Sequence, residues 1–303
     1  MAKVTTLRTR TQPVTVAEAT EAFLDHAELA VTSRRVYGAS LNSLGDGLGA
    51  HRRLDTLDAD TVAGWFTDRY GGVAPATWNR ELATVRSALR WWAAQGWVDA
   101  DRTVSLQRRR ERPDRTRALT RAQVERLWRA GDIGLREKTL WRLLYETAAR
   151  AGEILALDIA DLDLANKRAR VRSKGGAVDW VFWQTGAAQL LPRLLAGRRS
   201  GPVFLADRQP TRAVASVDVD PESGRARLSY RRAAHLFTAR TGWTLHQLRH
   251  SALTHAAEDG TNLPMLLARS RHASVRSLER YARPGPEAVA RMMAETDPAR
   301  RRR

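Results

Sequence analysis

The stretches LHQLRHSALTH, residues 245–255, and RSRHASVRSLERYARP, residues 269–284, hold the densest group of reactive side chains in this sequence. On a helix, His246, Arg249 and His250 would be spaced three and four residues apart and would project from one face. An imidazole beside a guanidinium suits a phosphodiester, because the arginine bonds the non-bridging oxygens while the histidine moves a proton. We therefore expect a helix here, with one face that handles a phosphate group.

Two other interpretations of this helix stay open from its residues alone. A histidine-rich helix can be a partly buried structural element. The spacing of His246 and His250 also fits a metal-binding pair, but Gln247 stands where a zinc protease would have its glutamate, and Arg249 is a poor neighbour for a dication. We therefore expect neither a metal site nor a bound cofactor.

The net charge indicates nucleic acid as the partner. The formal charge is +18, from 51 basic and 33 acidic side chains, and a field that positive attracts a polyanion. The whole excess lies in residues 105–303, which carry 39 basic and 21 acidic side chains, whereas residues 1–104 carry 12 of each. The later part of the chain is expected to supply most of the attraction.

Composition also excludes several classes of protein. The 303 residues include no cysteine, so disulfides, thiol nucleophiles and cysteine–zinc sites are excluded. No apolar run approaches the roughly 20 residues that span a bilayer, and the N-terminus lacks the apolar core of a secretory signal. We expect two domains in a soluble, cytoplasmic protein without a membrane partner.

The first domain is predicted to be a small helical bundle at residues 14–106, after a flexible stretch at 1–13. Thr15 and Glu18 form a capping box that opens its first helix. The fourth helix carries an apolar stripe with spacings of three and four residues, formed by Leu82, Val85, Leu89 and Trp92. Its polar face carries Arg80, Arg86 and Arg90, which either contact DNA phosphates or form a solvated surface.

A basic linker is predicted at residues 107–118, where six arginines occur without apolar periodicity. A second capping box, Thr120 with Gln123, then opens the larger domain, residues 119–296. Residues 297–303 are expected to form a basic tail.

Inside the larger domain we expect a helix at about 138–149, strands between 157 and 183, a surface loop at 207–227, and mostly helix elsewhere. Between Arg168 and Arg172 basic and apolar residues alternate, which predicts a strand with one basic face. Two glycines then turn the chain into a hairpin that carries Lys174 near its tip. The expected fold is therefore mainly α with a small antiparallel β-sheet, an α+β fold.

Taken together, these motifs resemble the tyrosine recombinase or phage integrase family of Xer-like, site-specific DNA recombinases. The resemblance covers residues 14–296. It rests on TAARAGEILAL at 147–157, the hairpin lysine, HQLRH at 246–250, and the nine-residue step from His272 to Tyr281. It implies a helical, SAM-like core-binding domain followed by a tyrosine-recombinase catalytic domain.

By that resemblance, the catalytic residues are Arg150, Lys174, His246, Arg249, His272 and Tyr281, supported by Glu153 and His250. The two arginines bind the non-bridging oxygens, and Lys174 is the general acid. His246 helps to move the tyrosine proton, while His272 hydrogen-bonds the phosphate. Tyr281 attacks the phosphorus and forms a 3′-phosphotyrosyl bond, which stores the energy for religation without ATP or metal.

Two features depart from the family pattern. Family members often have Leu-Gly before the second histidine, whereas Ser270 and Arg271 precede His272 here. The turn that aims this ring is therefore expected to differ. The balanced charge of residues 1–104 is also low for a domain that clamps DNA.

The resemblance further implies a bacterial, nucleoid-associated protein that is a monomer in solution and a homotetramer on synapsed double-stranded DNA. An accessory protein is compatible with it. The segment PEAVARMMA, residues 286–294, is predicted to form an amphipathic helix that docks on a neighbouring subunit. Integration or excision of a mobile element and resolution of chromosome or plasmid dimers fit equally well. Two alternatives remain: a DNA-binding protein on this scaffold that does not cleave, and a type IB topoisomerase.

Overall fold

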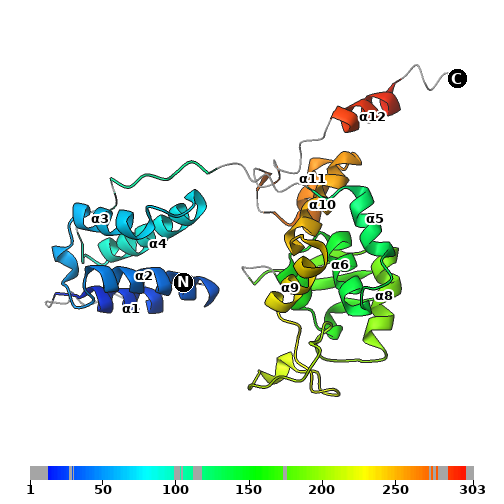
Figure 1. Ribbon diagram of the computed structural model, residues 1–303, viewed down its shortest axis with the longest axis horizontal. Helices are drawn as coiled ribbons and strands as arrows, with labels where there is room; N and C mark the ends of the chain where they lie inside the picture. Colours follow the sequence, from blue (N-terminus) through cyan, green and yellow to red (C-terminus); the bar gives the residue numbers. More distant parts are fainter. Residues whose placement is uncertain are drawn as a thin grey trace, which may run out of the picture. The chain divides into compact units, whose positions relative to one another are not determined.

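The computed structural model divides the chain into two compact units, residues 1–114 and 115–303, each of which we describe by itself (Figure 1). The structure describes residues 13–26, 29, 31–98, 103, 105–111, 118–172, 176–272, 274–275, 278 and 286–297. Over these residues, no helix is both long enough and apolar enough to cross a membrane.

The described residues of the first unit form the predicted helical bundle. Its elements are α1 (Val16–His26), α2 (Val31–Leu48), the 3-10 turn η1 (Leu54–Thr56), α3 (Ala59–Tyr70) and α4 (Pro75–Ala94). The capping box is confirmed, because the backbone N–H of Thr15 donates to Glu18 at 3.0 Å where α1 begins. The stripe of α4 is buried, and its Trp92 donates the indole N–H to the carbonyl of Ala19 on α1 at 2.8 Å. The predicted periodicity of α4 therefore builds the core of this unit.

Arg86 on α4 has partners within the protein. Its guanidinium donates to the backbone carbonyls of Thr103 at 3.2 Å and Leu106 at 2.6 Å. This half-buried side chain is therefore bonded inside the unit and does not belong to a fully solvated surface. Arg90, in contrast, is exposed.

The first residues of the predicted linker also pack on this unit. Arg109 places its guanidinium 3.7 Å from the ring centre of Trp78 and donates to the carbonyl of Gly71 at 2.8 Å. The side-chain amide of Asn79 both donates to and accepts from the backbone of Arg109, at 2.8 Å each. Residues 107–111 therefore follow a fixed path, and residues 112–117 lie outside the described part of the chain.

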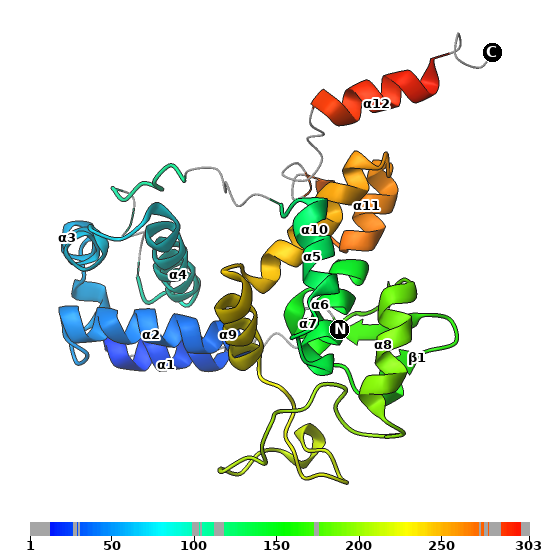
Figure 2. The same cartoon turned by 45° about the vertical axis from the view of Figure 1, so that its right-hand side comes forward.

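The described residues of the second unit are mainly helical. Its helices are α5 (Arg121–Arg129), α6 (Leu135–Thr147), α7 (Ala151–Leu155), α8 (Thr185–Leu195), α9 (Tyr230–Thr241), α10 (Leu245–Glu258), α11 (Leu263–Ser270) and α12 (Pro286–Thr296), with 3-10 turns η2 (Ile159–Asp161) and η3 (Ser216–Asp218). The predicted capping box opens α5, because the N–H of Thr120 donates to Gln123 at 2.7 Å. Helix α6, green in the middle of Figure 2, packs against both α8 and α10.

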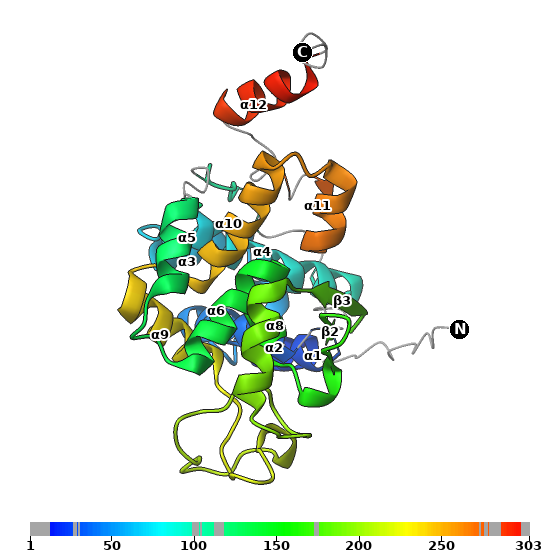
Figure 3. The same cartoon turned by 90° about the vertical axis from the view of Figure 1, so that its right-hand side faces the viewer.

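Three antiparallel strands complete this unit and confirm the predicted fold class. They are β1 (Leu162–Asp163), β2 (Arg168–Arg172) and β3 (Val178–Phe182), in the order β1-β2-β3. Ala169 and Val171 are buried between the arginines of β2, as the alternation predicts. Strand β3 lies next to α11 (Figure 3), and the two line a common cavity of about 430 Å³. The hairpin turn with Lys174 lies outside the described residues.

Helix α6 ends earlier than the predicted helix at 138–149. Ala148 adopts a left-handed conformation, with φ of 52° and ψ of 23°, and stops the helix at Thr147. This conformation costs a residue with a side chain about 1–2 kcal/mol, and no glycine in the sequence announces it. Arg150 consequently becomes the N-cap of α7 instead of lying inside a helix.

The loop predicted at residues 207–227 is tied to the unit at its end. Arg227 donates to Asp218 and Asp158, each at 2.7 Å. Inside the loop, Val219 and Ala226 form an antiparallel bridge. These contacts give the loop a definite path beside η2 without placing it in the site described below.

Candidate active site

Helix α10 carries three of the predicted site residues. Thr244 is its N-cap, and Gln247 closes a capping box by accepting the N–H of Thr244 at 2.8 Å. Gln247, which occupies the position that a glutamate has in zinc proteases, thus has a structural role. Arg249 and His250 are buried, at 2% and 9% exposure, whereas His246 is exposed.

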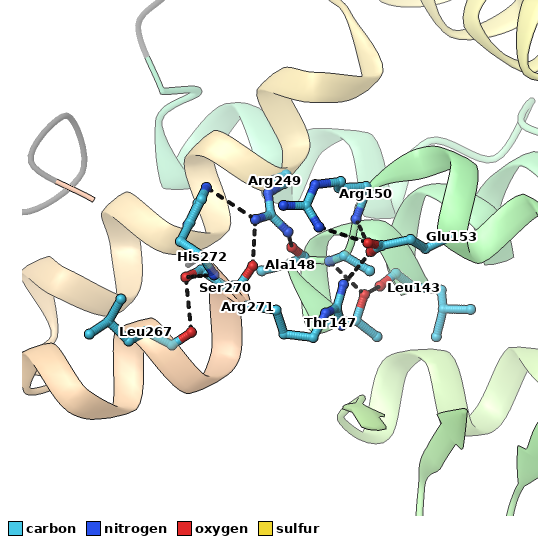
Figure 4. Close-up of polar contacts among 11 residues, drawn as sticks. Leu143, Thr147, Ala148, Arg150, Glu153, Arg249, Leu267, Ser270, Arg271 and His272 are labelled. Carbon is cyan, nitrogen blue, oxygen red and sulfur yellow. Dashed lines mark hydrogen bonds and ion pairs between the residues drawn. The ribbon is translucent and has the colours of Figure 1, made fainter. Parts of the chain in front are cut away.

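Arg249 joins three segments of the second unit (Figure 4). Its Nη1 donates to the carbonyl of Ala148, and its Nη2 donates to the carbonyl of Ser270 at 2.6 Å. Nη2 also lies 3.4 Å from Nε2 of His272. A charged group almost removed from water needs such partners, because an unpaired buried charge is costly. Arg249 therefore fixes the end of α6 and the end of α11 around α10.

The left-handed Ala148 presents its carbonyl to this guanidinium. The hydroxyl of Thr147 stabilises the turn, since it donates to Leu143 at 2.7 Å and accepts the N–H of Ala149 at 3.1 Å. Ala148 is fully buried. Strained backbone persists where surrounding contacts over-determine it, and here those contacts bring the chain to Arg150.

Arg150 and Glu153 form an ion pair at the start of α7. Nη1 of Arg150 donates to Oε1 of Glu153 at 2.8 Å, and its backbone N–H donates to Oε2 at 2.9 Å. The side chain of Arg150 is 46% exposed, whereas that of Glu153 is 8% exposed. The carboxylate thus fixes the Arg150 side chain, and the exposed part of its guanidinium remains accessible to an anion.

Arg271 is a member of this cluster that the sequence did not identify. It is the C-cap of α11 in a left-handed conformation, with φ of 52°, and its Nη2 donates to Oε2 of Glu153. Burial lowers the pKa of the Arg271 guanidinium, and the Glu153 carboxylate opposes part of that shift. The sequence marked this residue only as a departure from the usual glycine. An arginine at a position that favours glycine is a signal that could have indicated a role for the side chain, but from the sequence we expected only a different turn.

The structure brings four of the predicted residues into one connected group: Arg150, Glu153, Arg249 and His272. His246 and His250 lie beside Arg249 on α10. Lys174 and Tyr281 lie outside the described residues. Leu278, three residues before Tyr281, is 1% exposed and packs in an apolar cluster with Ala148 and α10.

The metal interpretation of α10 gains no support from this geometry. Over the described residues, no group of three or more histidine, aspartate or glutamate side chains is placed to hold a metal ion. The charged groups around Arg249 are instead arginines and one carboxylate, an arrangement that suits an anionic ligand.

Comparisons of the sequence and of the structure with known proteins lead to the same family. Residues 117–287 match the model of the phage integrase family. The tyrosine recombinase XerC of Mycobacterium tuberculosis strain H37Ra is 29% identical over 293 residues, covering 87% of this chain and 91% of the relative. XerD of Ralstonia nicotianae is 26% identical over 259 residues, covering 82% of each.

Solved structures share the fold at low sequence identity. The Tn1549 transposon integrase in complex with circular intermediate DNA has a TM-score of 0.66 at 16% identity, and the match covers 92% of this chain and 99% of that one. A lambda integrase dimer bound to a COC′ core site has a TM-score of 0.68 at 14% identity, covering 89% and 78%. Since its family model spans more than half of the sequence, the chain belongs to the phage integrase family and is a site-specific tyrosine recombinase.

Proposed function

We propose that this recombinase cleaves and rejoins double-stranded DNA at defined sites through a 3′-phosphotyrosyl bond to Tyr281. The observation that carries the proposal is the convergence of Arg150, Arg249 and His272 from three separate segments. Phosphodiester cleavage passes through a highly charged phosphorane, so preorganised cations around one point are the main catalytic requirement. The DNA-bound integrases with this fold support DNA as the partner.

The proposed first step is an in-line displacement at phosphorus. The Tyr281 oxygen forms a bond to phosphorus, the bond to the 5′ oxygen breaks, and Lys174 gives that oxygen a proton. His246 helps to take the proton from the tyrosine. The 5′-hydroxyl of a partner strand then reverses the step, which joins strands from two DNA molecules.

The cations have different roles in this proposal. Arg150 bonds the non-bridging oxygens directly, because 46% of its side chain is exposed. Arg249 supplies fixed positive charge and holds His272 toward the phosphate, because both of its terminal nitrogens are bonded inside the protein. Leu278, three residues before Tyr281 in the sequence, is buried in the same apolar cluster as Ala148, which supports our proposal that Tyr281 acts at this site.

We also propose that a homotetramer forms on paired sites in bacterial DNA, with α12 docking on a neighbouring subunit. Val289, Met292 and Met293 of α12 are exposed, between 44% and 61%, and such a surface is typical of an interaction site. Removal of residues 286–303 should abolish synapsis while leaving the binding of one protein to one site. Normal synapsis by the truncated protein would contradict this assembly.

The test of the function is a covalent DNA adduct. Purified protein is incubated with duplexes from the DNA that flanks its gene, nicked to trap the intermediate, with EDTA present. Wild type and Tyr230→Phe, an exposed tyrosine of α9, should give an adduct that survives SDS, and Tyr281→Phe should give none. Specific binding without an adduct from any protein would instead favour a DNA-binding protein that does not cleave.

A further inference from the structure

Arg271 occupies a backbone conformation that favours glycine. Its φ of 52° and ψ of 41° lie in the left-handed region, where a residue without a Cβ is least strained. The arginine therefore gains nothing from the backbone, and the reason for its presence lies in its side chain.

That side chain is committed to one carboxylate. Nη2 of Arg271 bonds Oε2 of Glu153, and both side chains are 8% exposed. Among the described residues, Nε and Nη1 of Arg271 have no hydrogen-bond acceptor. Glu153 is thus the acceptor that stabilises this buried cation, and Figure 4 shows the carboxylate lying between Arg271 and Arg150.

The carboxylate links the two cations. Oε1 accepts Nη1 of Arg150 at 2.8 Å, and Oε2 accepts both the backbone N–H of Arg150 and the guanidinium of Arg271. A buried carboxylate with only the half-exposed Arg150 as its cation would be poorly compensated. Arg271 supplies the second charge from the opposite segment and fixes the direction of the carboxylate.

We propose that Arg271 is a positioning residue for strand cleavage. Acting through Glu153, it sets the orientation in which Arg150 meets the phosphate, and it ties the turn that carries His272 to α7. This inference rests on the proposed function, because it assigns a role in the chemistry of that same site. It concerns the catalytic step and not the binding of DNA, since the guanidinium is buried.

The test compares two replacements at residue 271. Arg271→Gly removes the guanidinium and accepts the left-handed conformation, whereas Arg271→Lys keeps the charge. Two controls isolate other effects: Ala196→Gly relaxes a left-handed turn with φ of 50° at the end of α8, and Arg240→Gln removes a cation paired with Asp132 on the surface. Single-turnover adduct formation is measured on nicked duplex over a range of DNA concentrations, together with thermal unfolding.

Arg271→Gly should lower the maximal rate by about 10- to 100-fold, as expected when a supporting contact of a reactive group is lost. The DNA concentration for half-maximal rate should stay within about twofold, because only the catalytic step is affected. Arg271→Lys should recover part of the rate, and both controls should match wild type. Adding Glu153→Gln to Arg271→Gly should cost little more than either change alone, because coupled residues are not additive.

A maximal rate for Arg271→Gly equal to that of wild type would overturn the inference while leaving the proposed function intact. A change only in the half-maximal DNA concentration would also overturn it. A slow rate in Arg271→Gly that Arg271→Lys does not improve would show that the charge is irrelevant. Absence of an adduct from wild type itself would instead overturn the proposed function, and the inference with it.

Discussion

Two groups of arginines, one in each unit, have different roles. In the first unit, Arg86 and Arg109 donate to backbone carbonyls and hold one extended segment against the bundle. In the second, Arg150, Arg249 and Arg271 come from three segments and meet around one carboxylate and two turns. An abundance of arginine therefore says little about DNA contact, whereas convergence of arginines from distant segments indicates a site.

The largest expected effect is at the centre of the second unit. Arg249→Ala should slow adduct formation by about 10²- to 10³-fold, because it removes preorganised positive charge beside the phosphate and the contact that holds His272. The control is Arg227→Ala, which removes another guanidinium bonded to carbonyls and carboxylates in the same unit. Single-turnover rates should separate the two variants, and equal rates would contradict the assignment.

The opposite result is expected in the first unit. Arg86→Ala leaves the carbonyls of Thr103 and Leu106 without this donor, so the unit should lose about 1–3 kcal/mol of stability. The rate of adduct formation on saturating DNA should not change. Chemical denaturation measures the first quantity, and a fall in the rate without a fall in stability would break the comparison between the units.

A smaller effect concerns pH and the stability of the second unit. His255 is buried, and its Nδ1 lies 2.7 Å from the hydroxyl of Tyr145. Burial, reinforced by the charge of Arg121, lowers the pKa of His255 below its usual 6.5. The unfolded chain therefore binds this proton at a higher pH than the folded chain does.

The contribution of neutral, buried His255 to the free energy of unfolding is therefore fully present above about pH 6.5. It is lost as the pH falls through the pKa that His255 has in the folded protein. His255→Asn should show a shallower decline of the unfolding free energy between pH 7.5 and pH 5.5, a window chosen around the ordinary histidine pKa of about 6.5. Parallel curves for wild type and variant would show that His255 contributes nothing to the dependence.

The smallest effect is expected at an exposed arginine of α4. We expect Arg90 to contact a phosphate, so Arg90→Gln should reduce the slope of log affinity against log salt by about one. Arg34→Gln is the matched control, because Arg34 is exposed in the same unit but paired with Asp25 at 3.2 Å. Identical salt slopes for Arg90→Gln and wild type would show that Arg90 does not contact a DNA phosphate.

The sequence predicted what local spacing determines. The stripe of α4, the capping boxes at Thr15 and Thr120, and the alternation in β2 each report contacts within a few residues. Contacts between distant residues escaped prediction, as with Glu153 and Arg271, which are 118 residues apart.

The turn at Ala148 was missed for another reason. An alanine in the left-handed conformation carries no signal in the sequence, because tertiary contacts and not its own preference hold it there. The family resemblance supplied the predicted site residues, but it did not predict that Glu153 links Arg150 to Arg271.

The central claim is that Tyr281 becomes covalently joined to DNA, and the most direct measurement is to identify the residue that carries the DNA. The trapped adduct would be digested with protease and nuclease, and the remaining peptide sequenced by mass spectrometry. The account predicts a phosphate on Tyr281, linked to the 3′ end of the cleaved strand. Attachment to another residue, or to a 5′ end, would contradict it.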